Sequence, residues 1–392
     1  MKQPTVRNST LALVGLASLV IYILACTSFS PDDRRVLYPT FDSASRGVGV
    51  AVYDRDSKRS GLLFVPHLRV GEKPGDEPPL LRPQWLPDGR SVLVAWPGTE
   101  GTADSDDSLS VAVVPVGGRG PVRLFHLADL PDAAARLSLP LCVTGNRLLL
   151  QGESNTVVRL DLVTGEVKRQ ACANEVIPYA SPLPNRPCYA IEKSADGGFE
   201  VGFLDPETFA LTPIVRLDVE ESLGDGGLLA LSRDGRTAAF VAGNGNQPVI
   251  LFKEGRKPAR KSPKLAADDE KLSLANAQFS PRGEVLYASF VRNHGDATNA
   301  ALGFLEVPTD GKPAHRVTLI ERGPKLDEKD AFLFQIAVSH DGKALAVAST
   351  YLAYAEGTLR SDDCALFLVD LTDRRRKATK VPIPLPPKPR SI

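Results

Sequence analysis

Histidine is the most versatile chemical group in proteins, and this chain has few histidines, widely scattered along it. They are His67, His126, His294, His315 and His340. No two of them form the His-Glu-x-x-His pattern that holds zinc on one face of a helix. The Gly-x-Ser-x-Gly nucleophile elbow, the phosphate-binding P-loop and the Gly-x-Gly-x-x-Gly dinucleotide fingerprint are also absent from the sequence. The motifs therefore predict no catalytic residue and no cofactor, and the turn position of His340 indicates an ordinary surface residue.

Acidic clusters are the second candidates for chemistry, because carboxylate oxygens bind Ca²⁺. They are Asp54–Asp56, Asp104–Asp107 and Asp362–Asp363. None of them has the twelve-residue ligand pattern of a calcium-binding loop. The sequence favours solvated turns at these positions and predicts no metal site.

The N-terminus has the three-part layout of an export signal. Lys2 and Arg7 precede an uncharged apolar run from Thr10 to Ala25, and Cys26 follows the run. A positive segment, an apolar segment and a small residue before the cleavage point are typical of such signals. We therefore expect residues 1–30 to be a signal or an anchor, and the rest of the chain to lie outside the cytoplasm.

The step Ile23-Leu24-Ala25-Cys26 resembles a bacterial lipoprotein lipobox. This resemblance implies cleavage before Cys26 and attachment of a diacylglycerol to its sulfur, although a residue smaller than Leu24 is usual there. An uncleaved span remains an alternative, and so does an ordinary cleaved signal. The apolar run as a helix would measure about 24 Å at 1.5 Å per residue, against the ~30 Å of a bilayer core.

Four further cysteines, Cys142, Cys172, Cys188 and Cys364, leave the disulfide pattern open. Four cysteines allow three pairings, which a sequence does not distinguish. No Cys-x-x-Cys motif indicates zinc or redox chemistry. Cys172 and Cys188 flank a connection between strands and are the first candidates for a disulfide, whereas buried free thiols are the alternative.

A turn motif recurs along the chain and predicts the elements that would position any site. Asp-Gly and related corners stand between apolar, strand-like stretches, and this sequence is typical of tight antiparallel turns. The clear copies are Leu86–Arg90, Leu231–Arg236, Phe279–Glu284 and Val338–Lys343, and the weaker ones are Ser43–Arg46, Val143–Arg147 and Pro182–Arg186.

A second hairpin follows each corner, most clearly across 157–170, where apolar and polar residues alternate. The repeating unit is thus four strands, and the corners predict seven units, at 36–82, 83–130, 137–174, 176–222, 227–268, 272–324 and 331–386. Four-stranded sheets bury both faces only by stacking around an axis. We therefore predict an all-β propeller over 36–386 and a Pro-rich tail at 387–392, with Trp85 and Trp96 packed between blades.

The corner sequences resemble those of the TolB-like, WD-repeat-like propellers of bacterial envelopes. Pro83–Arg90 is the closest copy, and Phe279–Gly283 and Val338–Gly342 are near copies. The resemblance implies the propeller fold and an envelope location. The Trp-Asp dipeptide of WD repeats is absent.

The charge pattern excludes one class of partner and leaves several functions open. Basic and acidic residues balance at 47 each, and the densest basic block, Arg374–Lys377, reads as a solvated turn. Nucleic acid is therefore not expected as a partner. We expect a monomeric, membrane-anchored module that binds an envelope protein or polymer through long loops at 101–108, 293–299 and 354–363. The alternatives are a lyase or glycoside hydrolase with carboxylates in the central channel and a sensory role.

Overall fold

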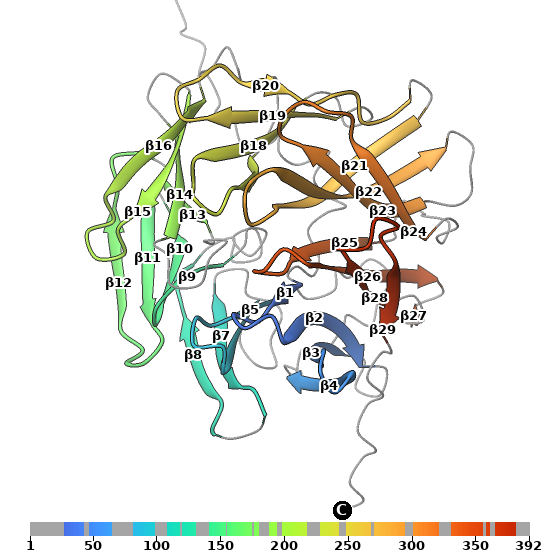
Figure 1. Ribbon diagram of the computed structural model, residues 1–392. Coiled ribbons are helices and arrows are strands. Elements are labelled where there is room, and N and C mark those ends of the chain that lie inside the picture. Colours follow the sequence, from blue (N-terminus) through green and yellow to red (C-terminus); the bar gives the residue numbers. More distant parts are fainter. Residues whose placement is uncertain are drawn as a thin grey trace, which may run out of the picture.

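The protein is a closed ring of seven small β-sheets, as the computed structural model in Figure 1 shows. The structure describes residues 27–381 apart from 43–46, 65–80, 99–107, 118–119, 131–140, 154, 175, 180–187, 194–197, 218–227, 243–247, 268–269, 295–300, 321–330, 356–357 and 361–364.

Each sheet is one blade, built from consecutive antiparallel strands with the first strand innermost. The first three blades are β1(Ser28–Phe29), β2(Arg35–Asp42), β3(Gly47–Asp54), β4(Arg59–Phe64); β5(Arg82–Trp85), β6(Ser91–Pro97), β7(Leu109–Pro115), β8(Arg123–Leu127); and β9(Cys142–Thr144), β10(Arg147–Gln151), β11(Thr156–Asp161), β12(Val167–Ala171). The fourth and fifth are β13(Val176–Tyr179), β14(Cys188–Lys193), β15(Phe199–Leu204), β16(Leu211–Leu217); and β17(Leu228–Leu231), β18(Thr237–Ala242), β19(Val249–Glu254), β20(Arg260–Lys261). The last two are β21(Glu270–Phe279), β22(Val285–His294), β23(Ala301–Pro308), β24(His315–Ile320); and β25(Ala331–Val338), β26(Ala344–Ala355), β28(Ala365–Asp370), β29(Ala378–Val381), with β27(Thr358–Arg360) added to β26.

The predicted seven-bladed architecture is confirmed, and the first blade begins earlier than expected. The corners at 86–90, 231–236, 279–284 and 338–343 each join the first two strands of a blade. In blade 1 this corner is Ser30–Arg34, between β1 and β2, so the blade begins at Ser28 and not at residue 36. The predicted corner at 43–46 falls between β2 and β3 and lies outside the described residues. The predicted corner at 182–186 also lies outside them.

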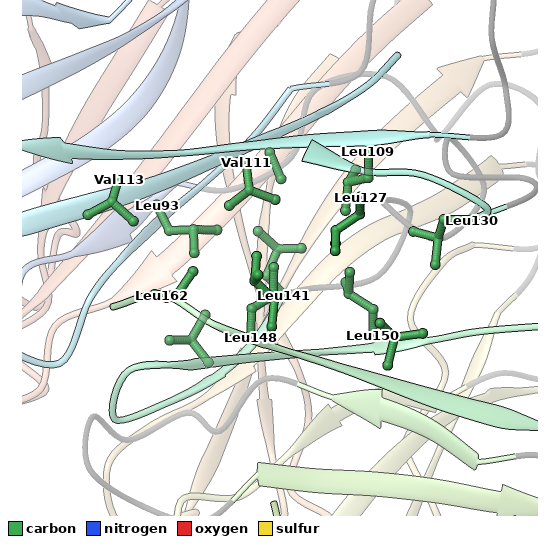
Figure 2. Packing of buried hydrophobic residues seen from close by; sticks show 14 of the residues in the cluster. Leu93, Leu109, Val111, Val113, Leu127, Leu130, Leu141, Leu148, Leu150 and Leu162 are labelled. Carbon is green, nitrogen blue, oxygen red and sulfur yellow. The ribbon is translucent and has the colours of Figure 1, made fainter. Parts of the chain in front are cut away.

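Seven apolar clusters hold the ring together, one at each boundary between neighbouring blades. Figure 2 shows the cluster between blades 2 and 3, where Leu109 and Val111 of β7 meet Leu148 and Leu150 of β10. The next residue on β7, Ala112, belongs to the cluster with blade 1. Because side chains of a strand point alternately to opposite faces, both faces of this blade are buried. This explains why β7 is a continuous apolar run.

The two tryptophans pack between blades 1 and 2, as predicted. Trp96 is fully buried and Trp85 is 6% exposed, both in the cluster that includes Leu37 and Val50 of blade 1. The indole nitrogen of Trp85 donates to the carbonyl oxygen of Ser28 at 3.2 Å. These side chains therefore stabilise the ring.

The corner glycines serve two purposes. Gly342 has a φ of +72°, which favours glycine, and a Cβ at this position would lie 2.9 Å from the Pro281 side chain in the corner of blade 6. A Cβ at Gly89 would lie 3.4 Å from Pro31 of blade 1, and one at Gly283 would lie 3.7 Å from Ser232 of blade 5, which are ordinary van der Waals contacts. The corners thus pack in sequence around the ring.

Replacement of Gly342 by alanine should cost more stability than the same change at Gly311. Both glycines have positive φ, but a Cβ at Gly311 would meet nothing within 4 Å. We expect Gly311→Ala to cost about 1 kcal/mol from backbone strain, and Gly342→Ala ~2–4 kcal/mol because the Pro281 contact adds overpacking. Chemical denaturation of both variants measures the difference, and equal losses would contradict packing between corners.

Candidate interaction face

Strand direction divides the ring into two faces. Because strands alternate in direction within each blade, the first-to-second corners and the third-to-fourth turns share one side. We call this side the corner face. It comprises the described corners 30–34, 86–90, 145–146, 232–236, 280–284 and 339–343 and the described turns 55–58, 116–117, 120–122, 162–166, 205–210, 255–259, 309–314 and 371–377.

The other side, which we call the entry face, is where β1 begins and β29 ends. The three long loops predicted to bind a partner each connect the second and third strands of a blade. Their flanking strands therefore reach the entry face, and most residues of these loops lie outside the described ones.

Asp33 occupies the position that glycine holds in the other corners. Its amide donates to the Ser30 carbonyl at 2.8 Å, as the Gly342 amide donates to the Ser339 carbonyl at 3.0 Å. Its φ is +57°, a conformation that aspartate tolerates better than most residues. The sequence Ser-Pro-Asp-Asp-Arg at 30–34 is thus a corner with aspartate in place of glycine.

The Asp33 carboxylate joins blade 1 to blade 7 and closes the ring. Its Oδ1 accepts from the His340 amide at 2.7 Å and lies 2.8 Å from Nδ1 of His340, and its Oδ2 accepts from the Asp341 amide at 2.9 Å. Burial alone would raise the pKa of Asp33, but hydrogen bonds from the His340 side chain and the two amides outweigh it, so the pKa is lowered. We call this arrangement of Asp33, His340 and Asp341 the closure clasp.

The expectation that His340 is an ordinary surface residue is therefore wrong. Its side chain is 23% exposed and packs against Asp33, because the ring brings blade 7 beside blade 1. Arg233 of blade 5 adds to the arrangement by donating to the carbonyl oxygens of His340 at 2.6 Å and Ser339 at 3.0 Å. The corners of blades 5, 7 and 1 are thus tied by polar contacts.

An ion pair joins blades 6 and 7. Arg376, within the basic block predicted to be a solvated turn, donates from Nε to Glu306 Oε1 at 2.6 Å. Its Nη1 donates to the carbonyl oxygens of Leu371 and Asp373. The expectation of solvation is thus wrong for Arg376, while Arg374 and Arg375 are exposed.

The alternative expectation was an enzyme with catalytic carboxylates on the innermost strands. Among their described residues the single carboxylate is Glu270, and no histidine occurs. Hydrogen bonds from Arg316 lower the pKa of Glu270 to about 2, and Arg292 adds a contact at 3.3 Å. Glu270 is therefore an ionised, paired carboxylate, unlike a general acid, whose pKa must be raised.

The acidic cluster at Asp54–Asp56 stabilises its own turn. Asp54 Oδ1 accepts from the amides of Asp56 and Ser57 at 3.1 and 2.8 Å, and Asp56 pairs with Arg34 at 2.6 Å. The clusters at 104–107 and 362–363 lie outside the described residues. Within the described part of the chain, no group of three or more histidines, cysteines or carboxylates could hold a metal ion.

The other histidines do not converge on one place. His126 is exposed on β8. Nδ1 of His315, on β24, lies 3.2 Å from Oε2 of Glu306 on β23. His67 and the side chain of His294 lie outside what the structure describes.

The predicted disulfide between Cys172 and Cys188 is wrong, because Cys172 is a free thiol. Cys172 follows the outer strand of blade 3, where its sulfur lies 3.9 Å from the Gln170 carbonyl oxygen. Cys142 on the innermost strand is instead disulfide-bonded, and it is buried between blades 3 and 4. The side chains of Cys26, Cys188 and Cys364 lie outside the described ones.

The signal or anchor was predicted over residues 1–30, and its end is wrong, because residues 27–30 belong to the propeller and Ser28–Phe29 form β1. Residues 1–26, with the predicted lipid site at Cys26, lie outside the described residues. No helix in the described part of the chain combines the length and hydropathy needed to cross a bilayer.

The sequence matches no protein-family model and no curated protein. Solved structures resemble the chain at low identity. One from a mitotic checkpoint complex is 15% identical over 83% of this chain and 87% of its own, with a TM-score of 0.48. KlAtg21, in complex with the coiled-coil of AgAtg16, is 11% identical over 92% of this chain and 98% of its own, with a TM-score of 0.49. TolB from Acinetobacter baumannii is 12% identical over 87% of this chain and 62% of its own, with a TM-score of 0.40. The seven-bladed assignment rests on the strand pairing described above.

Removal of the Asp33 charge should weaken the ring in a pH-dependent way. We expect Asp33→Asn to lose ~1–3 kcal/mol of unfolding free energy at pH 7, because a buried hydrogen-bonded charge is lost. The folded-state pKa lies below the ordinary 3.8, so this stabilisation is complete above that value and disappears as the pH falls through the folded-state pKa. Urea unfolding of both proteins from pH 7 to pH 3 should therefore show their difference shrinking in acid.

Asp88→Asn is the matched control, because Asp88 accepts from the amides of Arg90 and Ser91 in its own corner. It should cost less than Asp33→Asn at pH 7. A pH-independent loss for Asp33→Asn, or an equal loss for both variants, would contradict the closure clasp.

Alkylation of the native protein should distinguish its cysteines. We expect iodoacetamide to modify Cys172 without reductant and Cys142 only after reduction under denaturing conditions. Burial and the Glu192 carboxylate raise the pKa of the Cys172 thiol, so its reaction should accelerate above neutral pH. Peptide mass spectrometry measures both, and modification of Cys142 without reductant would contradict the disulfide.

Proposed function

We propose that this chain is an exported, membrane-anchored propeller that presents its corner face to another protein of the cell envelope. The observation that carries the proposal is the direction of β1. Thr27 directly follows Cys26, and β1 runs from Ser28 toward the corner at Ser30–Arg34. An anchor ending at Cys26 would therefore hold the entry face toward the membrane and the corner face away from it.

The disulfide at Cys142 supports export. Stable disulfides form in oxidising compartments and are rare in the cytosol. A buried disulfide at a blade boundary suits a domain that folds after crossing a membrane.

The attachment of Thr27 supports a firm orientation. Thr27 is 6% exposed, and its amide donates to Gln335 Oε1 of blade 7 at 2.9 Å. No flexible linker therefore stands between Cys26 and the ring. A propeller fixed so close to its anchor would turn little relative to the membrane, which favours a role in holding a partner on one side.

The described residues favour binding over catalysis. The innermost strands offer one described carboxylate, which two arginines neutralise. The corner face carries the closure clasp and turns of both charge signs, and such charges favour a partner surface of complementary charge.

The proposal predicts that Cys26→Ser stops lipid labelling and releases the propeller from its native membrane. The serine lacks the sulfur that a diacylglycerol would modify. Metabolic labelling with a fatty acid, followed by membrane fractionation, measures both effects.

Ser28→Cys in the Cys26→Ser background is the matched control, since it returns a thiol two positions away and should not restore labelling. Retention of the unlabelled Cys26→Ser protein in the membrane would favour the uncleaved anchor. An unlabelled wild-type protein found only in the cytosol would contradict export.

A further inference from the structure

Cys142 is disulfide-bonded, so one other cysteine of this chain supplies the second sulfur. Cys172 is a free thiol and is therefore not that cysteine. The remaining candidates are Cys26, Cys188 and Cys364, whose side chains lie outside the described ones. The described residues beside each candidate decide which of them can reach Cys142.

Cys142 faces the boundary between blades 3 and 4. It is 1% exposed and belongs to the apolar cluster at this boundary, as does Leu149, its cross-strand partner on β10. Val143, the next residue of β9, belongs instead to the cluster between blades 2 and 3. Because side chains of a strand point alternately to its two faces, the Cys142 sulfur lies on the side of blade 4.

Position 188 has a register that faces the same boundary. Cys188 begins β14 and is paired with Leu204 of β15, which belongs to the cluster that contains Cys142. Ala190, two residues further along β14, also belongs to this cluster, whereas Tyr189 belongs to the cluster between blades 4 and 5. The alternation along β14 therefore places position 188 on the face that blade 4 turns toward blade 3.

The two strands also lie close enough for a disulfide. Cα atoms of β9 and β14 come within 8 Å of each other, and Figure 1 shows these strands next to each other. A disulfide joins residues whose Cα atoms are about 4–7 Å apart. Since β9 consists only of Cys142–Thr144, this approach takes place close to Cys142.

The other two candidates adjoin distant parts of the ring. Thr27 follows Cys26, and its amide donates to Gln335 of blade 7. Ala365 follows Cys364 and belongs to the cluster between blades 6 and 7. Because adjacent Cα atoms are only about 3.8 Å apart, neither cysteine can reach the boundary between blades 3 and 4.

We propose that a disulfide joins Cys142 to Cys188 and locks the innermost strands of blades 3 and 4 together. Each thiol loses one proton and one electron when the bond forms, and an oxidising disulfide of the envelope accepts both pairs and becomes a dithiol. The bond closes a loop over 142–188 that contains the other three strands of blade 3. This pairing does not depend on the recognition of a partner by the corner face.

The disulfide strengthens a boundary at which backbone pairing is short. β9 pairs with β10 at only three positions. Two ion pairs fasten the same boundary, because Glu207 of blade 4 binds Arg147 and Arg159 of blade 3. A covalent link adds to them by restricting the unfolded chain.

Peptide mapping of the native full chain without reductant tests the pairing. Free thiols are blocked with iodoacetamide in denaturant, and the protein is digested with trypsin and chymotrypsin. Trypsin alone would leave Cys172 and Cys188 in one peptide, since Arg186 precedes a proline, whereas chymotrypsin also cuts after Tyr179 and separates them. We expect one crosslinked pair of peptides, with Cys142 in one and Cys188 in the other, which reduction separates.

Two other results of this map would overturn the proposal. A crosslink from Cys142 to Cys26, Cys172 or Cys364 would assign a different partner. Alkylation of Cys142 before reduction would show that the bond is absent.

Removal of the partner gives a second test, in a Cys172→Ser background that leaves no known free thiol to compete. In Cys188→Ala, we expect Cys142 to react with iodoacetamide in denaturant without reductant. Cys364→Ala is the matched control and should leave Cys142 protected. Protection of Cys142 in the first variant, or its reaction in the second, would contradict the pairing.

Urea unfolding tests whether the bond stabilises the ring. Reductant should lower the unfolding midpoint of the wild-type protein by on the order of 1 M urea. The double variant Cys142→Ala/Cys188→Ala, which lacks the bond, should unfold at the same midpoint with and without reductant. An unchanged wild-type midpoint, or an equal shift in both proteins, would overturn the stabilising role of this disulfide.

Discussion

The whole structure depends on blades that cannot bury their own apolar faces. Each four-stranded sheet has two apolar faces, and only a neighbouring blade on either side removes them from water, so the ring must close. All strands of a blade are consecutive in sequence, and among the described residues no strand is exchanged between chain ends. Side-chain contacts between the first and last blades therefore close the ring. Small residues of blade 7, such as Ala344 and Ala346, pack against Tyr38 and Tyr53 of blade 1, and Asp33 adds charged hydrogen bonds to His340 and Asp341.

This mode of closure also relates the fold to the proposed function. β1 begins and β29 ends on the entry face, so the described ends of the propeller lie opposite the corner face. Local aspartate hydrogen bonds fix turns of the corner face, as Asp161 and Asp205 do. A rigid surface loses little conformational entropy on binding, which favours recognition by such a face.

The sequence predicted the repeating parts of the fold and missed the parts that depend on ring closure. Corners with Asp-Gly and strands with period-2 alternation are local patterns, so the seven units were predictable. The corner at Ser30–Arg34 was missed because aspartate replaces glycine there and because it stands next to the signal-like segment. The role of His340 was missed because its partner, Asp33, lies at the other end of the chain. The disulfide state was also unpredictable, because it depends on which cysteines face one blade boundary.

In the proposed arrangement, the anchored protein holds its corner face away from the membrane. Fluorescence quenching by nitroxide-labelled lipids tests it most directly, with the full chain in bilayers and a Cys172→Ser background. One fluorophore is attached at Glu153→Cys, in a loop on the entry face, and another at Lys312→Cys, on the corner face. We expect strong quenching at position 153 and weak quenching at position 312. Equal quenching at both positions, or stronger quenching at 312, would contradict it.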